Sequence, residues 1–267
     1  MPLQVLATPI GNLADVSPRA RRALAGAELV AAEDTRVTRK LYAALGLVAP
    51  RVLRFSGAGM QRSAQRIADE VASGKRVVVV SDAGTPVVSD PGHLAVRACL
   101  DRGLSVEPIP GPSAAVLAVS VSGLPCAPFH VLGFPPRKPG PLRRWLQAQG
   151  ALPGSLVLFE SPQRTASTVR AIADVLVDRE VCLCRELTKL HEEVLLGGAS
   201  ELADQLAARE LKGEVTLVIG PGEAPKRELA EPGEGLRSIA QALADRWGVP
   251  RREAYQRLLE LERSLGG

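Results

Sequence analysis

The 267-residue sequence has few of the residues from which metal centres, disulfide frameworks and base-stacking surfaces are built. Its four cysteines and three histidines show neither CxxC nor HxxxH spacing, the patterns typical of zinc sites. Aromatic residues make up 3% of the chain, which is too few for a platform that stacks on single-stranded bases. We therefore expect reduced cysteines, no metal ion, and no nucleic-acid recognition by stacking.

Long apolar runs are also missing. The apolar segment Val77–Val80 is far shorter than the roughly 20 residues that a membrane-spanning helix needs. Residues 1–8 lack the basic region and the long apolar region of a secretory signal. These absences predict a soluble cytoplasmic protein without a membrane partner.

Positive charge is present but unevenly distributed. The formal net charge is only +4, yet residues 35–68 and residues 108–159 contain no acidic side chain. Such segments suit a phosphate-rich partner, because lysine and arginine displace its counterions; a solvated helix face would produce the same pattern. The basic residues of the two segments are Arg36, Arg39, Lys40, Arg51, Arg54, Arg62, Arg66, Arg137, Lys138, Arg143 and Arg144.

Short apolar segments alternate with helical patterns, which predicts an α/β fold. Because Val77–Val80 is apolar without interruption, we expect it at the centre of a parallel sheet that is covered on both faces. Ser17 and Pro18 have the character of a helix start, and Gly74 and Gly103 of helix ends. In the first half, the predicted strands are residues 3–7, 29–32, 52–55, 75–81 and 105–109.

The second half repeats this alternation after a Pro/Gly-rich passage at residues 108–112, a predicted helix of small residues at 113–122 and a break at 123–125. Its third and fourth predicted strands lie so close in sequence that they should pair antiparallel, which makes this sheet mixed. We thus predict an N-terminal lobe, residues 1–115, with a five-stranded mainly parallel sheet, and a C-terminal lobe, residues 116–222, with a five-stranded mixed sheet. The second set of predicted strands is residues 129–133, 155–159, 181–186, 192–196 and 214–219.

The last segment, residues 223–267, is predicted to be an appendage to the two lobes. Its composition predicts a linker at residues 221–233 and two short helices at 235–246 and 250–261, joined in a helix-turn-helix-like manner. From residue 221 onward there are eight basic and eight acidic residues, so the charge excess of a DNA reader is missing. A packing or docking module is the better interpretation.

The turn at residues 81–92, SDAGTPVVSDPG, follows the central predicted strand. The carboxyl end of a parallel strand is where open α/β sheets bind ligands. Asp82 can accept hydrogen bonds from an ammonium or hydroxyl group, and Gly84 lets the backbone approach a ligand closely. The alternative is that Asp82 merely caps a turn.

Other strand ends carry similar polar loops. Residues 8–12 and 110–113 follow the first and fifth strands, and three loops at one sheet edge can form one crevice. Neither GxGxxG nor GxxxxGK[ST] is present, which excludes the usual dinucleotide and P-loop sites. In the second lobe, Glu160 and residues 185–189 lie at strand ends and are candidates for the same ligand site. The alternative is that Glu160 is only an acid at a helix start and that residues 185–189 form a ladder of surface ion pairs.

Together these loops resemble the tetrapyrrole methylase-like (class III) S-adenosylmethionine-dependent methyltransferases. Within that family they are most similar to the small-subunit ribosomal RNA methyltransferase I branch, which methylates a cytidine ribose 2′-oxygen in 16S rRNA. Nine stretches carry the resemblance in order: ATPIGNL (7–13), AAEDTR (31–36), SDAGTPVVSDPG (81–92), PIPGPSA (108–114), SGLP (122–125), LGFPP (132–136), FESPQR (159–164), RELTK (185–189) and KGEVTLVIG (212–220).

The resemblance implies a homodimer, with S-adenosylmethionine bound between the lobes of each chain and 16S rRNA or the small ribosomal subunit as partner. The chain departs from the branch at Ala58, Gly59 and Met60, where a His-Asn-Glu run is usual. The implied donor contacts are Pro9, Ile10, Gly11, Asp82, Gly84, Thr85, Ser113, Ala114, Phe159 and Leu187. The expected RNA contacts are Arg36, Arg39, Lys40, Arg137, Lys138, Arg143 and Arg144.

Methyl transfer to a ribose oxygen needs in-line placement in a dry cleft and a group that takes the hydroxyl proton. Glu33, Asp34, Glu160 and Glu186 are candidates, and we predict Asp34 as the base. Lys189, like Arg36, suits a phosphate or a developing oxyanion. Two alternatives remain at this point: a methyltransferase acting on a precorrin-type tetrapyrrole, and a non-catalytic relative that binds RNA or the ribosome.

Overall fold

The computed structural model describes residues 1–57, 59–87, 92–222, 239–241, 243–244 and 248–265. The chain divides into two compact units, Met1–Gly222 and Glu223–Gly267. Most of the predicted linker 221–233 and most of the predicted helix 235–246 lie outside the described residues; helix α10, Arg251–Leu265, overlaps the last predicted helix. Within the described part of the chain, no helix combines the length and apolar content needed to cross a membrane.

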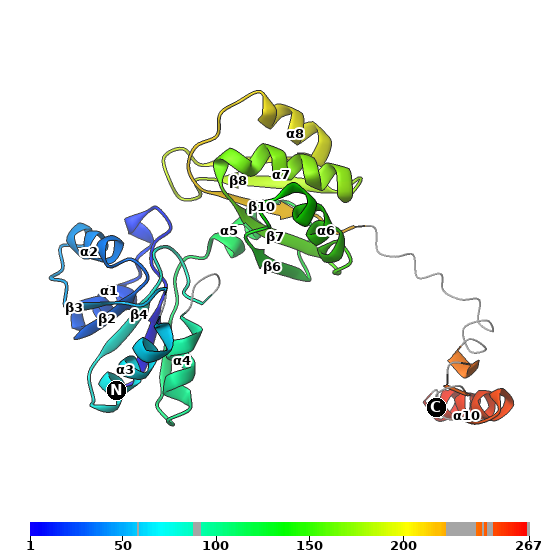
Figure 1. Ribbon diagram of the computed structural model, residues 1–267, viewed down its shortest axis with the longest axis horizontal. Helices are drawn as coiled ribbons and strands as arrows, with labels where there is room; N and C mark the ends of the chain where they lie inside the picture. The colour runs from blue at the N-terminus through cyan, green and yellow to red at the C-terminus, as the bar shows by residue number, and fades with distance from the viewer. Residues whose placement is uncertain (58, 88–91, 223–238, 242, 245–247, 266–267) are drawn as a thin grey trace. The chain divides into compact units, whose positions relative to one another are not determined.

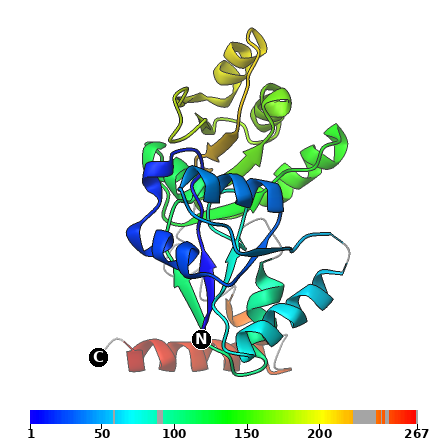
Figure 2. The same cartoon turned by 90° about the vertical axis from the view of Figure 1, so that its left-hand side faces the viewer.

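The first sheet consists of five parallel strands in the order β3-β2-β4-β1-β5. Figures 1 and 2 show the lobe that contains it in two views related by a 90° turn. The prediction that Val77–Val80 is central is confirmed, since this segment is β4 and all four valines are buried. The five strands are β1 (Leu3–Leu6), β2 (Leu29–Ala32), β3 (Arg51–Arg54), β4 (Val77–Val80) and β5 (Val106–Ile109).

Two helices cover each face of this sheet, which explains the uninterrupted apolar sequence of β4. Val77 and Val79 pack with α3 (Met60–Ala72) and α4 (His93–Leu100), whereas Val78 and Val80 face the other way. The opposite face is covered by α1 (Pro18–Gly26) and α2 (Thr35–Ala44). A strand that is buried on both faces needs apolar residues at every position.

Local signals set the helix ends as predicted. The Ser17 side chain accepts a hydrogen bond from the Ala20 amide, with Pro18 at the first helical position. Gly74 and Gly103 follow α3 and α4 with φ of +85° and +68°, the left-handed conformation that commonly ends helices.

The second sheet is mixed, as predicted, with the order β6-β7-β10-β8-β9. Strands β6 and β7 are parallel, and the remaining neighbours, β8 and β9 among them, are antiparallel. Its strands are β6 (Phe129–Gly133), β7 (Ser155–Glu160), β8 (Glu180–Arg185), β9 (Glu193–Gly198) and β10 (Val215–Ile219). The α/β fold with one parallel and one mixed five-stranded sheet is therefore confirmed.

Helix α5 (Ala114–Val121) joins the two sheets in sequence and packs against one face of the second (Figure 1). The other face carries α6 (Pro139–Gln149), α7 (Pro162–Val175) and α8 (Ala199–Ala207). Both sheets are thus layered between helices.

The strands of the first sheet end level with one another. Register pairs Arg54 of β3 with Ala32 of β2, Ala32 with Val80, Val80 with Leu6, and Leu6 with Ile109. The loops that follow all five strands consequently leave the same edge side by side. This edge positions the site described next.

Candidate functional site

The loops after β1, β4 and β5 are joined into one surface by hydrogen bonds. The Thr8 amide donates to the Gly84 carbonyl oxygen (2.9 Å), and the Gly84 amide donates to the Thr8 oxygen (3.1 Å). The Thr85 hydroxyl donates to the Pro112 carbonyl oxygen (3.0 Å), and the Ser81 hydroxyl to that of Gly84 (2.8 Å). The three loops that sequence placed at one edge thus meet.

Gly84 occupies the junction of these loops in a conformation that favours glycine. Its φ is +79°, and a Cβ atom there would lie 3.2 Å from Ile10 Cγ2 and 3.6 Å from the Pro112 carbonyl oxygen. A side chain would strain the backbone and push the neighbouring loops apart.

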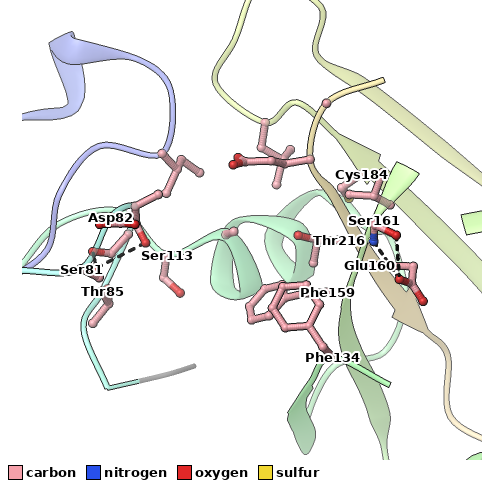
Figure 3. Close-up of a pocket in the computed structure, with 18 of the residues that line it drawn as sticks. Ser81, Asp82, Thr85, Ser113, Phe134, Phe159, Glu160, Ser161, Cys184 and Thr216 are labelled. Carbon is pink, nitrogen blue, oxygen red and sulfur yellow. Dashed lines mark hydrogen bonds between the residues drawn. The ribbon is translucent and has the colours of Figure 1, made fainter. Parts of the chain in front are cut away.

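A cavity of ≈ 460 Å³ lies between this surface and the second lobe. We call it the interlobe pocket; its size is in the range of small-molecule sites. Figure 3 shows Ser81, Asp82, Thr85 and Ser113 on one side, and Phe134, Phe159, Glu160, Ser161, Cys184 and Thr216 on the other. Of the predicted site residues, it is lined by Ile10, Asp82, Gly84, Thr85, Ser113, Ala114, Phe159, Glu160 and Leu187.

Two of the predicted donor contacts, Pro9 and Gly11, do not line this pocket, and neither do Lys189 and Asp34. Pro9 and Gly11 lie on an adjoining hollow of ≈ 270 Å³, which also reaches Asp82. Lys189 packs over Gly11, since a Cβ on Gly11 would overlap the Lys189 side chain at Cγ. Asp34 lies on a different concavity, described below.

Lys189 is held by two carboxylates beside the pocket. Its Nζ lies 2.8 Å from Glu186 Oε1 and 2.9 Å from Glu214 Oε2. Burial alone lowers the pKa of Lys189, but the hydrogen bonds to these carboxylates outweigh it and raise the pKa above its ordinary value. Glu186 and Thr188 have φ of +52° and +69°, so the segment that presents Leu187 to the pocket is a strained turn fixed by ion pairs.

Glu160 is buried and fully engaged. Its carboxylate accepts hydrogen bonds from the Ser161 amide and the Thr168 hydroxyl, both at 2.7 Å, and pairs with Arg164 at 3.1 Å. Arg164 also donates to the Pro136 carbonyl oxygen (2.9 Å). Glu160 thereby connects β7, α7 and the loop after β6 on one wall of the pocket.

Several lining residues were not singled out from sequence. Phe134 is 67% exposed, and its ring centroid lies 5.6 Å from that of Phe159. Phe134 and Thr216 lie within two of the stretches that carry the family resemblance, LGFPP and KGEVTLVIG. That was the only signal for them, because an isolated aromatic or threonine carries no chemical pattern of its own.

A second, polar concavity of ≈ 660 Å³ adjoins the interlobe pocket. It is lined by Glu33, Asp34, Thr35, Arg36, Arg54, Ser56, Gly57 and Asp82. Glu33 and Asp82 line both cavities. The two cavities are therefore separated by these two carboxylate residues.

Asp34 caps α2 and holds Arg36. Its side chain accepts from the Arg36 amide (2.8 Å) and pairs with the Arg36 guanidinium (2.6 Å). The hydrogen bonds that Arg36 donates through its side chain and its backbone hold the pKa of the Asp34 carboxyl well below its ordinary value. The Asp34 amide in turn donates to Asp82 Oδ1 (2.9 Å).

The predicted RNA contacts are all exposed, but they come from two lobes. Arg36, Arg39 and Lys40 lie on α2. Of the other four, Arg137 and Lys138 lie just before α6, and Arg143 and Arg144 lie in the middle of α6, where Arg143 pairs with Asp174. Arg36 alone of the seven lines the polar concavity.

A parallel α/β lobe joined to a mixed one, with a ligand-sized pocket at the carboxyl edge of the parallel sheet, defines a two-lobed α/β protein that binds a small molecule. The family described as Tetrapyrrole (Corrin/Porphyrin) Methylases matches residues 3–203. The chain belongs to this family.

Curated relatives resemble the chain over nearly its whole length. It is 40% identical to "Ribosomal RNA small subunit methyltransferase I" of Mesorhizobium japonicum, over 99% of this chain and 93% of the relative. It is 41% identical to the protein of the same name from Mycobacterium tuberculosis, over 98% and 95%. The protein of that name from Thermotoga maritima is 40% identical over 83% of this chain and 99% of its own length.

Solved structures share the fold at low sequence identity. The methyltransferase CobJ matches with a TM-score of 0.60 and 16% identity, over 82% of this chain and 94% of its own. Uroporphyrin-III C-methyl transferase from Thermus thermophilus, complexed with S-adenosyl homocysteine, matches with a TM-score of 0.55 and 18% identity, over 82% and 97%. At this identity the likeness supports the fold alone.

Proposed function

We propose that this protein transfers a methyl group from S-adenosylmethionine to a cytidine ribose 2′-oxygen of 16S rRNA in the small ribosomal subunit. The observation that carries the proposal is the 40–41% identity, over nearly the full chain, to relatives named for small-subunit rRNA methylation. The tetrapyrrole alternative has weaker support: the description of the family as a whole and solved structures below 25% identity. We place the activity in the cytoplasm, where its substrate would be found.

The interlobe pocket suits the methyl donor chemically. S-adenosylmethionine has an aromatic base, ribose hydroxyls and a charged amino-acid end. Phe134 and Phe159 offer aromatic surface, whereas Asp82 and the hydroxyls of Thr85 and Ser113 offer hydrogen-bonding groups. We propose that these residues, with Ile10, Gly84, Ala114 and Leu187, hold the donor, and that Pro9 and Gly11 support them from the adjoining hollow.

When bound, S-adenosylmethionine supplies the methyl group, whose bond to sulfur breaks as the bond to the ribose oxygen forms. The chain must then accept the ribose proton. Glu33 lines both cavities, and we propose it as the acceptor. Asp34 was the choice from sequence, but a carboxylate whose pKa is held so low is a weak base, and a role in positioning Arg36 suits it better. We likewise propose Glu160 and Lys189 as positioning groups, because Glu160 links β7 to α7 and Lys189 packs over Gly11 beside the pocket.

This division of roles can be tested by pH dependence. Because its pKa is lowered, Asp34 stays ionised above its ordinary pKa of about 3.9 and loses its charge only at more acidic pH. Asp34→Asn should therefore leave the shape of the pH–rate profile near neutrality unchanged. Glu33→Gln should lower the transfer rate by about 100-fold or more at unchanged donor affinity. If the transfer rate changes with pH near neutrality and Asp34→Asn abolishes that change, Asp34 is the base instead.

The function itself is tested with labelled donor and small subunits that lack the modification. Label on a cytidine ribose is the expected result, and the nucleotide can be mapped by primer extension. Label on a tetrapyrrole but not on RNA would favour the first alternative. Donor binding without transfer to either substrate would favour the non-catalytic relative.

We also propose a homodimer, and the second sheet offers a surface for it. The register aligns Val131, Val157, Val218, Cys182 and Leu196 in one row across the sheet. Helix α5 covers the three central residues of this row, while Val131 and Leu196 on the edge strands are 38% and 51% exposed. Large apolar patches on a soluble protein mark interaction sites.

Helix α5 extends the same apolar surface. A helix that is apolar all round is normally buried, yet Val116 and Val121 are 55% and 48% exposed. A second copy of the chain would cover them. The exposed apolar residues of this face are Val116, Val121, Phe129, Val131, Val194 and Leu196.

Introducing a charge into this face should separate the two chains. We expect the unmodified protein to sediment as a dimer and Leu196→Glu as a monomer, because a buried, unpaired carboxylate costs several kcal/mol. Val177→Glu is the matched control, since Val177 is 67% exposed and lies outside this face. A monomeric unmodified protein, or a dimeric Leu196→Glu variant, would contradict the proposal.

The basic residues on both lobes and residues 223–267 also have roles in the proposed function. The exposed basic residues of α2 and α6 would bind phosphates from both lobes, which predicts strong salt dependence. Residues 223–267 we propose as a docking module, separate from the methyl-transfer lobes.

A further inference from the structure

We propose that the polar concavity is the site of the target nucleotide, with a flanking phosphate held by Arg36 and Arg54. The inference rests on the proposed function and names where its substrate binds. The ribose would then lie at the boundary between the two cavities, beside Glu33 and Asp82.

The sheet topology places this concavity next to the donor site. Its walls come from the loops after β3, β2 and β4, whereas the first-lobe side of the interlobe pocket comes from the loops after β4, β1 and β5 and from Glu33 after β2. In the strand order β3-β2-β4-β1-β5, the loops after the neighbouring strands β2 and β4 are shared. The turn after β4, with Asp82, is consequently in contact with both cavities. A methyl acceptor in one can reach a donor in the other.

Arg54 is positioned for an anion. Its Nε donates to the Ser56 hydroxyl (3.0 Å), which donates to the Glu33 carbonyl oxygen (3.0 Å). This chain of hydrogen bonds fixes the guanidinium beside the loop that carries Glu33. Arg54 forms no ion pair with any residue that the structure describes, and it is exposed. A guanidinium with free donors is a good phosphate ligand.

Arg36 supplies the second cation. Asp34 holds it by an ion pair, yet the Arg36 side chain is 83% exposed, so donors remain available to a ligand. Asp34 orients this arginine toward the concavity without being buried with it. Two guanidiniums on neighbouring loops can bind the oxygens of one phosphate.

The floor of the concavity leaves room for a nucleotide. Gly57 has φ of +74°, and none of the atoms that the structure describes lies within 4 Å of the place where its Cβ would be. None of the eight described residues that line the concavity is aromatic. The base would thus be held without stacking, and selection of the nucleotide would depend on the fold of the surrounding RNA.

The test compares Arg36→Ala, Arg54→Ala and the occluding variant Ser56→Trp with Arg21→Ala, an exposed arginine of α1 outside both cavities. Each is assayed for S-adenosyl homocysteine binding by calorimetry, for binding to unmethylated small subunits, and for methyl transfer. Each arginine variant should raise the KM for subunits about 10-fold or more and reduce the slope of log affinity against log salt by about 1. Ser56→Trp should abolish transfer.

Donor affinity should be unchanged in all four variants, which also shows that they fold. If Arg36→Ala and Arg54→Ala match Arg21→Ala in KM and salt slope, the inference is overturned while the methyltransferase function stands. If Ser56→Trp transfers methyl groups at the normal rate, the nucleotide binds elsewhere. If the unmodified protein transfers no methyl group to subunits, it is the proposed function that fails.

Discussion

Replacing Asp82 with alanine is expected to weaken S-adenosyl homocysteine binding by about 100-fold or more. Asp82 follows the central strand, lines both cavities and accepts a hydrogen bond from the Asp34 amide. Hydrogen bonds to charged groups contribute about 1.5–3 kcal/mol each, and every 1.4 kcal/mol is tenfold in affinity. Isothermal titration calorimetry measures the effect directly.

Two further variants test whether the loss of affinity is specific to the charge and position of Asp82. Asp82→Asn keeps an oxygen acceptor for the Asp34 amide but loses the charge, so its affinity should lie between those of Asp82→Ala and the unmodified protein. Asp101→Ala removes a half-exposed carboxylate that pairs with Arg97 on α4, and it should bind the donor normally. If Asp82→Ala binds S-adenosyl homocysteine as tightly as the unmodified protein, the interlobe pocket is not the donor site.

The second large effect is expected from Gly84→Ala. A side chain at φ of +79° costs about 1–2 kcal/mol, and the new Cβ would crowd Ile10 at the point where Thr8 and Gly84 exchange hydrogen bonds. The loops after β1 and β4 would have to separate. We therefore expect a Tm lower by a few degrees and donor affinity reduced at least about 10-fold.

Gly103→Ala is the control that distinguishes the effect of backbone strain from that of a change in the shape of the donor site. Gly103 has φ of +68°, and nothing lies within 4 Å of its added Cβ. It should lose a similar amount of stability, measured by urea unfolding, and bind the donor with normal affinity. Equal donor affinities in the two variants would mean that the Gly84 junction does not shape the site.

Much of the fold could be predicted because it depends on local patterns. The continuous apolar sequence of β4 predicts burial on both faces, and α1–α2 and α3–α4 provide it. The close spacing of β8 and β9 predicts their antiparallel pairing. These features follow from side-chain periodicity and chain length between elements, which the sequence states directly.

The chemistry of neighbouring side chains was less predictable. Glu33 and Asp34 are adjacent acids after β2, and from sequence we predicted Asp34 as the base. In the structure, Asp34 begins α2 and is turned to cap it and to bind Arg36, whereas Glu33 lines both cavities. A backbone that changes from strand to helix sends successive side chains in directions that periodicity does not specify.

For the site around the turn at residues 81–92, some features follow from the sequence and others depend on the tertiary structure. By itself the sequence determined the elements, their order in two lobes, the polar loops at the strand ends and the resemblance that names the family. Only the tertiary structure decided that Lys189 packs over Gly11 beside the pocket, that Phe134 and Thr216 line it, and that Asp82 borders two cavities. The physical reason is that elements follow from local periodicity, while a pocket is formed by side chains from distant segments that meet only after both sheets have packed.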